Sequence, residues 1–441
     1  ISALFISLFG FAQKGSLEGI VVNPISNEPV AFANVAIYGT TLGTATDLDG
    51  KFKIMGIEAG FVKVQVSSVG FEPVITNEIL VTNARTAFIE IKMNESSVQL
   101  GEVNVKAATF QRKDESPLSM RTLTISELEK SPGGNRDISK VIQTLPGVGG
   151  SVSFRNDVIV RGGGPSENRF YLDDVEIPNL NHFATQGASG GPVGIVNIDF
   201  VRSVDFYSGA FPANKGNALS SVLSFKQVDG NKEKMKFRAS VGASDMALTM
   251  DGPLSDKTSM VFSVRRSYLQ FLFSALELPF LPTYNDAQFK IKTRFDEKNE
   301  LTLIGLGAYD NSVLNLHANK TEEQRYILGY LPEYGQWNYT LGGVYKHYRE
   351  HGYQTLVVSR NHLNNSSDKY LGNNKNNLKI LDYSSSEIEN KIRYENTFKT
   401  DNEFKINMGA GAEYAQYFNN TFQYRYASDG LNTIDYTTNL D

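Results

Sequence analysis

Hydrophobic and polar residues alternate with a period of two in the part of the chain that runs from about Lys232 to Asp441. Between Phe404 and Tyr414 the even-numbered residues are apolar or aromatic, and polar residues or glycine stand between them. Residues 388–398 and 337–345 repeat the alternation, and residues 301–309 show it more weakly. One apolar and one polar face over ~10 residues is typical of a membrane-spanning strand, whereas strands of soluble sheets are usually ~5–6 residues long. The pattern favours an antiparallel transmembrane β-barrel over a soluble sheet.

Shorter apolar segments separated by turns lie nearer the N-terminus. They are Leu17–Val22, Val35–Tyr38, Lys51–Ile54, Val62–Ser67 and Phe88–Met93. Strands of this length with turn signals between them predict a small β-sandwich. Asp47–Gly50 has the start of a calcium loop, but the remaining ligands are missing, so an ordinary hairpin turn is the favoured interpretation.

Between Arg121 and Val228 the pattern is mixed. Thr124–Leu128 begins like a capped helix, and Asp137–Leu145 has helical spacing of its apolar residues. Four strands are predicted after these helices, at Val158–Arg161, Arg169–Leu172, Val201–Tyr207 and Leu219–Phe225. Glycine-rich loops separate them. We expect a compact α+β domain.

The first residues, Ile1–Gln13, form an apolar run that is too short to cross a bilayer as a helix, which needs ~20 residues. We interpret them as the remnant of a secretory signal, the alternative being a buried N-terminal strand. Residues 94–119 are polar and read as a linker that contains one short apolar segment at Leu100–Val105.

Composition narrows the function further. The 441 residues carry a net charge of −5, which gives no broad basic face for nucleic acid. The absence of cysteine excludes disulfides, thiolate zinc sites and cysteine nucleophiles. Phe and Tyr are abundant, at 27 and 21 residues, which suits β-structure and the aromatic girdles of a membrane barrel.

Three consecutive pieces of the sequence resemble a TonB-dependent outer-membrane receptor with an extra N-terminal domain. Residues 17–54 resemble the carboxypeptidase-regulatory-like module, which is a transthyretin/Ig-like β-sandwich. Residues 145–183 (LPGVGG…RGGG…YLDDVEIPNLNHF) resemble the core of the plug domain, and residues 204–225 resemble its closing segment. FSVRRSYLQFL resembles an early barrel strand of this family.

The resemblance implies a mainly β chain in five parts. These are a signal remnant (1–13), the sandwich (14–94), a linker (95–119), an α+β plug domain (120–230) and the first part of a transmembrane antiparallel β-barrel (231–441). At ~10 residues a strand, the last part supplies nine or ten strands, whereas plugged transporters of this kind close with ~22. We therefore expect the chain to be a fragment of a longer receptor, with its sandwich in the periplasm.

Individual residues inherit expectations from the resemblance. The TonB-engaging candidate comprises Leu100, Glu102, Val103 and Val105, which could add as a strand to a partner's sheet; a first plug strand and a plain linker are the alternatives. The residues that match the plug signature are Pro146, Gly147, Arg161, Gly162, Gly163, Asp173 and Asp174. Among these, Arg161 is expected to lie against barrel carboxylates.

A second set of residues is expected to face ligand. Asn181, His182 and Phe183 fall where the family places an apical loop, and the alternative is a plain glycine-rich connection. Residues 268–281 are apolar enough for a lipid-facing strand and periodic enough for a short helix, so both interpretations stay open.

Enzyme motifs were tested against the same pattern. His347–His351 fits the H-x-x-E-H zinc-protease motif, but its two histidines need a helix, and the preceding alternation predicts a strand. The loop RGGGPSEN lacks the Lys-Ser/Thr pair of a phosphate loop, and the Asp173-Asp174 pair is expected to be structural. The sequence predicts no enzyme, no metal site and no cofactor.

The resemblance implies active import of a bulky ligand, such as a siderophore, cobalamin, a glycan or a peptide. The implied partners are TonB with its inner-membrane energising complex, outer-membrane lipid, the unknown ligand and, in one branch of the family, a surface lipoprotein. The alternative is an adhesion or assembly protein, or a passive pore, without energy coupling.

Overall fold

The structure is a computed structural model that describes residues 14–83, 86–96, 120–131, 137–151, 155–185, 190–242, 244–400, 404–427 and 430–440. It divides into two compact units, Ile1–Ala108 and Thr109–Asp441. The signal-like segment 1–13 and the TonB-engaging candidate Leu100–Val105 lie outside the described residues.

The first unit contains the expected β-sandwich. Its strands are β1 (Gly15–Val22), β2 (Asn34–Ile37), β3 (Gly43–Ala45), β4 (Lys51–Ile57), β5 (Gly60–Val62), β6 (Val64–Ser67), β7 (Val74–Ile75), β8 (Ile79–Val81) and β9 (Ala87–Lys92). They form sheets with the orders β4-β1-β9, β3-β2-β6-β7 and β5-β8. Because β3 and β4 belong to different sheets, Asp47–Gly50 is a turn between sheets and not the hairpin that the sequence suggested.

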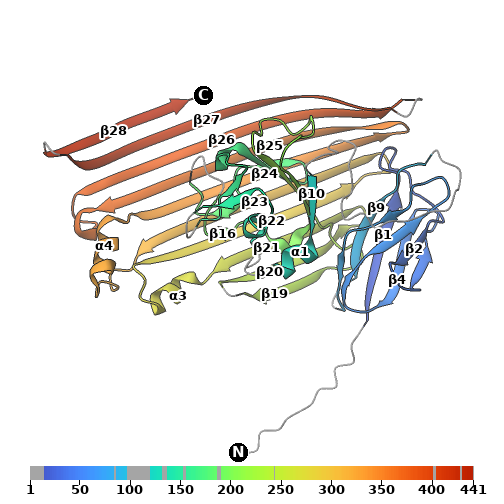
Figure 1. Ribbon diagram of the computed structural model, residues 1–441, viewed down its shortest axis with the longest axis horizontal. Helices are drawn as coiled ribbons and strands as arrows, with labels where there is room; N and C mark the ends of the chain where they lie inside the picture. The colour runs from blue at the N-terminus through green and yellow to red at the C-terminus, as the bar shows by residue number, and fades with distance from the viewer. Residues whose placement is uncertain are drawn as a thin grey trace, which may run out of the picture. The chain divides into compact units, whose positions relative to one another are not determined.

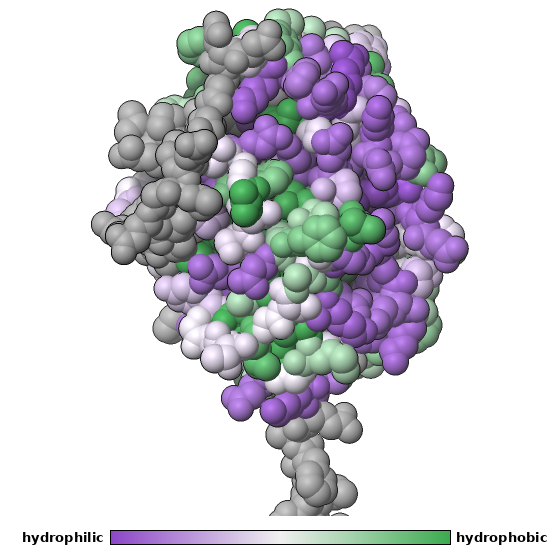
Figure 2. All heavy atoms as spheres, turned by 90° about the vertical axis from the view of Figure 1, so that its right-hand side faces the viewer, coloured by the Kyte–Doolittle hydropathy of each residue, from purple (hydrophilic) through white to green (hydrophobic). Residues whose placement is uncertain are grey.

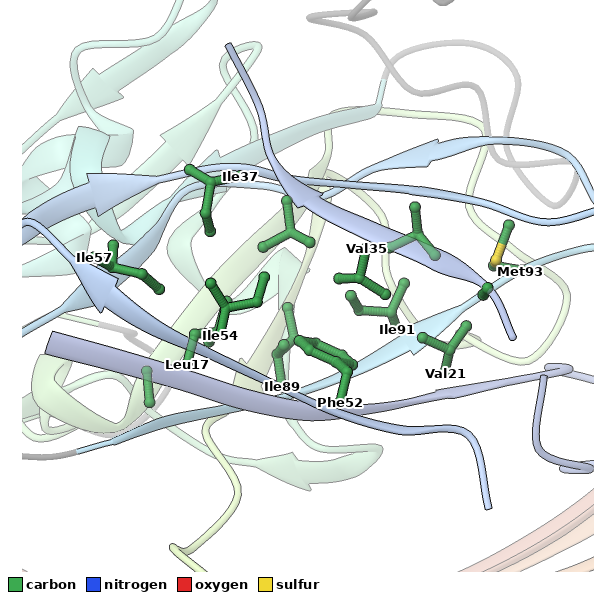
Figure 3. Close-up of a cluster of buried hydrophobic side chains, with 14 of the residues drawn as sticks. Leu17, Val21, Val35, Ile37, Phe52, Ile54, Ile57, Ile89, Ile91 and Met93 are labelled. Carbon is green, nitrogen blue, oxygen red and sulfur yellow. The ribbon is translucent and has the colours of Figure 1, made fainter. Parts of the chain in front are cut away.

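Alternation along each strand creates the sandwich core. In β4 the side chains of Phe52, Ile54 and Ile57 are buried, and those of Lys53 and Met55 between them are exposed. Figure 3 shows these side chains meeting Leu17, Ile89 and others from the remaining strands. The sandwich surface is mixed, since Phe32, Leu48, Met55 and Val69 are exposed. The space-filling view likewise has hydrophobic residues scattered among hydrophilic ones (Figure 2).

The second unit begins with an α+β region, residues 120–230, which we call the middle domain. Its main sheet has the order β10-β17-β18-β13-β14. Its elements are β10 (Met120–Thr124), α1 (Ile125–Lys130), α2 (Ile138–Ile142), β11 (Val148–Gly150), β12 (Val158–Val160), η1 (Pro165–Glu167), β13 (Asn168–Leu172), β14 (Val175–Ile177), β15 (Asn181–His182), β16 (Val193–Gly194), η2 (Ile198–Phe200), β17 (Val201–Tyr207) and β18 (Ser221–Gln227).

Both predicted helices of the middle domain are present. Thr124 and Glu127 form a reciprocal capping box at the start of α1, which explains why the helix begins there. The Asp137 carboxylate caps α2 by accepting a hydrogen bond from the Ser139 amide.

The rest of the second unit is a ten-stranded antiparallel sheet in sequential order from β19 to β28. Its strands are β19 (Lys236–Val241), β20 (Asp245–Ser255), β21 (Thr258–Ser267), β22 (Phe280–Arg294), β23 (Asn299–Leu314), β24 (Glu333–Arg349), β25 (Gly352–Tyr370), β26 (Lys379–Lys399), β27 (Lys405–Ala427) and β28 (Gly430–Leu440). The number of strands agrees with the expectation of nine or ten. None of the helices in the described parts of the chain has the length and apolar character that a membrane crossing requires.

Two details differ from the sequence pattern. Residues 268–281 contain both of the structures left open, because α3 (Leu269–Ala275) precedes β22, which starts at Phe280. The run after Arg360 continues as strand β25 to Tyr370, although most of its residues are polar. Its backbone groups pair with β24 and β26, so polar side chains do not end the strand.

The connections at the two ends of the strands differ, and we call these two sides of the sheet the loop edge and the turn edge. At one edge, the loop edge, α3, α4 (Glu322–Tyr330) and η3 (Leu371–Asn373) lie in the connections β21–β22, β23–β24 and β25–β26. At the opposite edge, the turn edge, the connections are short, such as residues 256–257 and 350–351. Long loops on one side and short turns on the other are the asymmetry of outer-membrane barrels, where the loops face outward.

The two faces of the sheet differ as well. The middle domain packs on one of them, the inner face, in front of the long strands (Figure 1). The opposite, outer face exposes large apolar side chains, among them Leu248, Val264, Leu303, Leu341, Val358, Ile392 and Met408. They include Leu303, Leu341, Ile392 and Met408 of the period-two pattern, so the alternation separates the face that packs against the middle domain from an apolar outer face.

Candidate functional site

A buried histidine holds the middle domain on the inner face of the ten-stranded sheet, which we call the wall. The imidazole of His182, on β15, has Nδ1 2.7 Å from Oδ1 of Asp310 on β23 and Nε2 3.2 Å from Oδ2 of Asp286 on β22. All three side chains are completely buried. The ring also stacks on Tyr284 at 4.3 Å between centroids. With a carboxylate at each nitrogen, the geometry suits an imidazolium that donates two hydrogen bonds.

The charge state of His182 follows from its neighbours. Burial disfavours the charged imidazole, but Asp310 and Asp286 outweigh burial and raise its pKa to about 9. Arg265 adds a second cation, because its Nε lies 2.9 Å from Asp286 and its Nη2 donates to the Gly194 and Ile195 carbonyls at 3.1 and 2.7 Å. This guanidinium thus links the wall carboxylate to the backbone beside β16.

Backbone hydrogen bonds continue the contact on either side. The Phe183 amide donates to Asp310 at 2.8 Å, and the Ala184 amide donates to the Gln336 side chain at 3.1 Å. Gly191 permits the close approach of β15 and β16, since a Cβ at Gly191 would lie 1.7 Å from the His182 carbonyl oxygen. The β15–β16 hairpin is therefore attached to the wall through side chains and backbone together.

Asn181 faces the interior of the middle domain. Its amide nitrogen donates to Asp137 at 3.0 Å, and its oxygen accepts from Ser139 at 3.0 Å. Burial raises the pKa of the Asp137 carboxyl despite these hydrogen bonds. The structure thus places Asn181 and His182 in buried polar networks and Phe183 beside Tyr334, with ring centroids 6.3 Å apart. Contact of these three residues with a ligand stays a prediction.

A second attachment is formed by the acidic turn Asp173-Asp174, which joins β13 to β14. Both residues have positive φ, 45° and 75°, as in the two-residue turns that match strand twist. Asp173 accepts from the Gln227 amide at 3.1 Å and lies 2.9 Å from Lys290 of β22. The turn carries charge at a point where its backbone already approaches the wall.

Asp174 is surrounded by cations from both sides of the contact. Its carboxylate lies 3.3 Å from Lys215 and 3.6 Å from Lys346 of β24, and its carbonyl accepts from Arg393 of β26 at 3.0 Å. Burial opposes its charge, but the surrounding lysine ammonium groups outweigh burial and hold the pKa of this carboxyl well below its usual range. Lysine and arginine side chains thus supply the positive charge around the Asp173-Asp174 pair.

The buried position of Lys215 disfavours the charged form of its ammonium group. Burial lowers the pKa of its ammonium group to about 8, although Asp174 acts in the opposite direction. The ammonium lies 4.0 Å from the centre of the Tyr171 ring, a cation–π contact that partly replaces water.

A third ion pair lies nearby. Glu176 of β14 lies 2.9 Å from Lys391 of β26, which also lies 3.0 Å from Glu389. Acidic residues of the β13–β14 hairpin therefore meet bases of the wall, whereas at β15 a cation of the middle domain meets wall carboxylates.

Arg161 differs from the sequence-based expectation. Its side chain is exposed, and its guanidinium donates to the Ser208 hydroxyl at 3.2 Å. No ion pair joins it to a wall carboxylate within the described residues, whereas His182 contacts two such carboxylates. Arg161 instead belongs to a turn, where its amide donates to the Gly147 carbonyl at 2.8 Å and Gly162 has a φ of 80°. Pro146 is the residue before Gly147 in this turn. Gly163 has no room for a side chain, because a Cβ at this position would overlap the Ser220 hydroxyl.

The H-x-x-E-H residues are separated by the strand end. His347 lies on β24 with Nδ1 2.9 Å from Asn299, and His351 lies in the turn that follows. Across the described residues, no group of three or more His, Cys, Asp or Glu could hold a metal ion.

The wall partners Asp286, Asp310, Lys346 and Arg393 were not identified from the sequence. Each is a charged residue at a position whose strand neighbours two residues away also face inward. The period-two alternation could therefore have predicted that these four side chains face inward. It could not predict which residue of the middle domain each one contacts.

Comparisons with known families match two of these regions. Residues 17–105 match the CarboxypepD_reg-like domain, and residues 112–222 match the TonB-dependent receptor plug domain. The TonB-dependent receptor SusC of Bacteroides thetaiotaomicron is 40% identical over 73 residues, which are 17% of this chain and 7% of that protein.

Solved structures share the fold over about two thirds of the chain. A mutant form of the ferric enterobactin receptor PfeA of Pseudomonas aeruginosa has a TM-score of 0.50 and 15% identity, covering 69% of this chain and 50% of PfeA. The siderophore receptor PirA of Acinetobacter baumannii also has a TM-score of 0.50 and 15% identity, covering 69% of this chain and 48% of PirA. The chain spans about half the length of these structures, and at this identity they support the fold alone.

Proposed function

Because this chain belongs to the TonB-dependent receptors of the outer membrane, we propose that it is part of an active transporter that imports a bulky ligand through a plugged barrel. The middle domain is then the plug, and the ten-stranded sheet is part of the barrel wall. Ligand would bind from the loop edge, and TonB would act on the linker from the periplasm. TonB with its inner-membrane energising complex is the implied partner.

The observation that carries this proposal is how the plug is attached. Its contacts with the wall include hydrogen bonds and ion pairs made by His182, Asp173, Asp174 and Glu176. Polar contacts lose most of their strength once water enters, because a high dielectric screens them. A mechanical pull can therefore free the plug without exposing a hydrophobic core.

Deletion of Leu100–Val105 in the full-length receptor tests energy coupling. Cells would first be screened with a radiolabelled ferric siderophore, cobalamin, an oligosaccharide and a peptide. Import of the accepted probe should fall at least tenfold after the deletion, while its binding to the cells persists. Deletion of residues 106–111 of the same linker provides a length-matched control. Unchanged import after the linker deletion would contradict coupling through that segment.

The alternative of adhesion, assembly or passive passage predicts a different result. A passive pore would import its probe equally well after the proton motive force is collapsed, and an adhesion protein would import none of the four. A surface lipoprotein partner, which one branch of the family uses, stays a prediction.

A further inference from the structure

The outer face of the sheet carries two copies of one polar arrangement. In the first, Arg266 of β21 is the cross-strand neighbour of Asn285 on β22, which in turn is the neighbour of Tyr309 on β23. In the second, Arg360, Asn390 and Tyr414 occupy the same relationship on β25, β26 and β27. We call these the Arg266 triad and the Arg360 triad.

The hydrogen bonds of the two triads correspond. Nη1 of Arg266 donates to Oδ1 of Asn285 at 2.9 Å, and Nη1 of Arg360 donates to Oδ1 of Asn390 at 2.7 Å. Each asparagine then donates from Nδ2 to the carbonyl of its tyrosine, at 3.4 Å in both triads. The asparagine therefore fixes one edge of each guanidinium and leaves further N–H groups directed outward.

Both arginines lie on the face that otherwise carries apolar side chains, and both are exposed. Within the described residues neither guanidinium forms a salt bridge, whereas the basic residues of the inner face, such as Lys346 and Lys391, pair with carboxylates. Among the described residues, these two permanent charges thus have an amide partner each, and Arg360 a tyrosine hydroxyl as well, but no carboxylate. Arginine in this setting favours a phosphate, which it can bind with two parallel hydrogen bonds.

An apolar groove accompanies each triad. The first groove is lined by Leu248, Val264 and Ala287 together with all three residues of the Arg266 triad. The second is lined by Leu341, Val358 and Ile392 together with all three residues of the Arg360 triad. This arrangement is complementary to a phospholipid or a similar lipid, because the arginine can bind the phosphate while the apolar groove holds an acyl chain of the same molecule.

The heights of the triads agree with a headgroup position. Arg266 stands nine residues after Lys257 and Arg360 nine residues after His351, which are both in turns of the turn edge. Nine residues span ~30 Å along a strand, or ~23 Å in height at the usual ~40° tilt. This is close to the ~25 Å apolar band of an outer-membrane barrel, so both triads lie at its upper boundary, toward the loop edge.

We propose that the two triads are binding sites for the phosphate of a lipid in the outer leaflet, with an acyl chain of that lipid in the adjoining groove. Each arginine binds the phosphate, each asparagine positions the arginine, and the tyrosine ring covers the junction with the chain. The Arg360 triad is supported further by Tyr339, whose hydroxyl accepts from Nε of Arg360 at 3.0 Å. The proposal concerns the wall alone and does not depend on what the receptor transports.

The test uses the purified full-length receptor in phosphatidylcholine nanodiscs that contain a small fraction of lipid A. Native mass spectrometry after release from the disc would compare retention of phosphorylated lipid A with that of the same lipid after removal of its phosphates. We expect the phosphorylated form to be retained at least tenfold better. Single R266Q and R360Q variants should each lose part of this difference, and the double variant should lose it.

Arg349→Gln is the matched control, because Arg349 is an exposed arginine of the outer face at the turn edge, with Gly352 as its cross-strand neighbour. Should the glutamine variants fail to fold, Asn285→Asp with Asn390→Asp keeps both arginines and gives each a carboxylate neighbour, which should expel the phosphate. Equal retention of the two lipids by the wild type would overturn the proposal. So would unchanged discrimination in the double Arg→Gln or Asn→Asp variant, because the arginines would then be membrane-interface anchors without a lipid site.

Discussion

Nδ1 of His182 lies 2.7 Å from Oδ1 of Asp310 across the boundary between plug and barrel, with both side chains completely buried. The two residues are 128 positions apart in sequence, so the contact exists only when the plug is packed against the wall. We call this packed state the seated plug. The raised pKa of His182 couples its protonation to seating, because the charged imidazole is stabilised only beside the wall carboxylates. Seating should therefore depend on pH.

The sign of this dependence follows from the direction of the shift. A histidine whose pKa rises from 6.5 to about 9 on seating contributes its full stabilisation below pH 6.5 and loses it as the pH rises through 9. The effect is on the order of 3 kcal/mol, or about a hundredfold in local opening. Hydrogen-exchange protection of the Phe183 and Ala184 amides should fall by this factor between pH 6 and pH 9.5.

His182→Gln should remove this pH dependence and lower protection at pH 6, while His317→Gln, at an exposed loop histidine, should change neither. Lys215 acts in the opposite direction, since its lowered pKa makes seating more favourable as the pH rises above about 8. The pH dependence due to His182 is therefore the difference in hydrogen-exchange protection between the wild type and His182→Gln at each pH. Parallel pH profiles for the two would mean that His182 is not the titrating group.

Asp174→Asn should weaken the second attachment. The substitution leaves Lys215, Lys226 and Lys346 around an uncharged amide, and breaking a buried ion pair from one side typically costs ~3–5 kcal/mol. Since Asp174 is about one-fifth exposed, we expect the lower end of that range. Hydrogen exchange of the β13–β14 hairpin should accelerate about a hundredfold. Asp256→Asn, at an exposed aspartate in a short turn, is the control, and equal exchange in the two variants would contradict a role for the lysine cluster.

Local patterns were sufficient for much of the fold. The predicted strand Val201–Tyr207 coincides with β17, and the predicted cap at Thr124 is the capping box of α1. Both depend on residues that are close in sequence, where period and hydrogen-bonding chemistry act directly. The even-numbered apolar residues from Ile406 to Tyr414 likewise belong to one strand, β27, whose pleat alone decides their common face.

The attachments could not be derived in this way. His182 meets Asp286 and Asp310 over separations of 104 and 128 residues, and no period in the sequence encodes that pairing. The family resemblance pointed to Arg161 instead, yet its guanidinium donates to the Ser208 hydroxyl. The turn between β13 and β14 could be placed from the sequence, but its lysine partners come from strands far along the chain.

Gly191→Ala should disturb the seating of the β15–β16 hairpin. An added Cβ would lie 1.7 Å from the His182 carbonyl oxygen, so the two strands must separate and His182 must leave its carboxylates. Cells that carry the full-length variant should become several-fold more sensitive to vancomycin, which an intact plug excludes by size. Gly329→Ala is the control, because Gly329 lies in α4 with open space around its Cβ position. Equal sensitivity of the two variants would show that the hairpin tolerates the displacement.

A disulfide between plug and wall tests whether import requires the β13–β14 hairpin to move. A Cβ built at Gly342 of β24 lies 3.2 Å from the Cβ of Val175 on β14, just below the ~3.5–4.5 Å usual for a disulfide. The chain has no cysteine of its own, so V175C with G342C introduces one defined pair. Oxidation should lower import of the accepted probe at least tenfold, and a reductant should restore it.

The single variants V175C and G342C separate this effect from damage by the substitutions. Neither should respond to oxidant, because neither can link plug to wall. G342C retains Val175, whose Cγ2 would lie 2.5 Å from the new Cβ, so any loss of import that G342C shows with and without oxidant measures this overlap alone. A gel shift of the double variant measures how much cross-link has formed. Full cross-linking with undiminished import would mean that ligand passes while this hairpin stays on the wall, and the plug would then have to open on the β15 side, where His182 is its anchor.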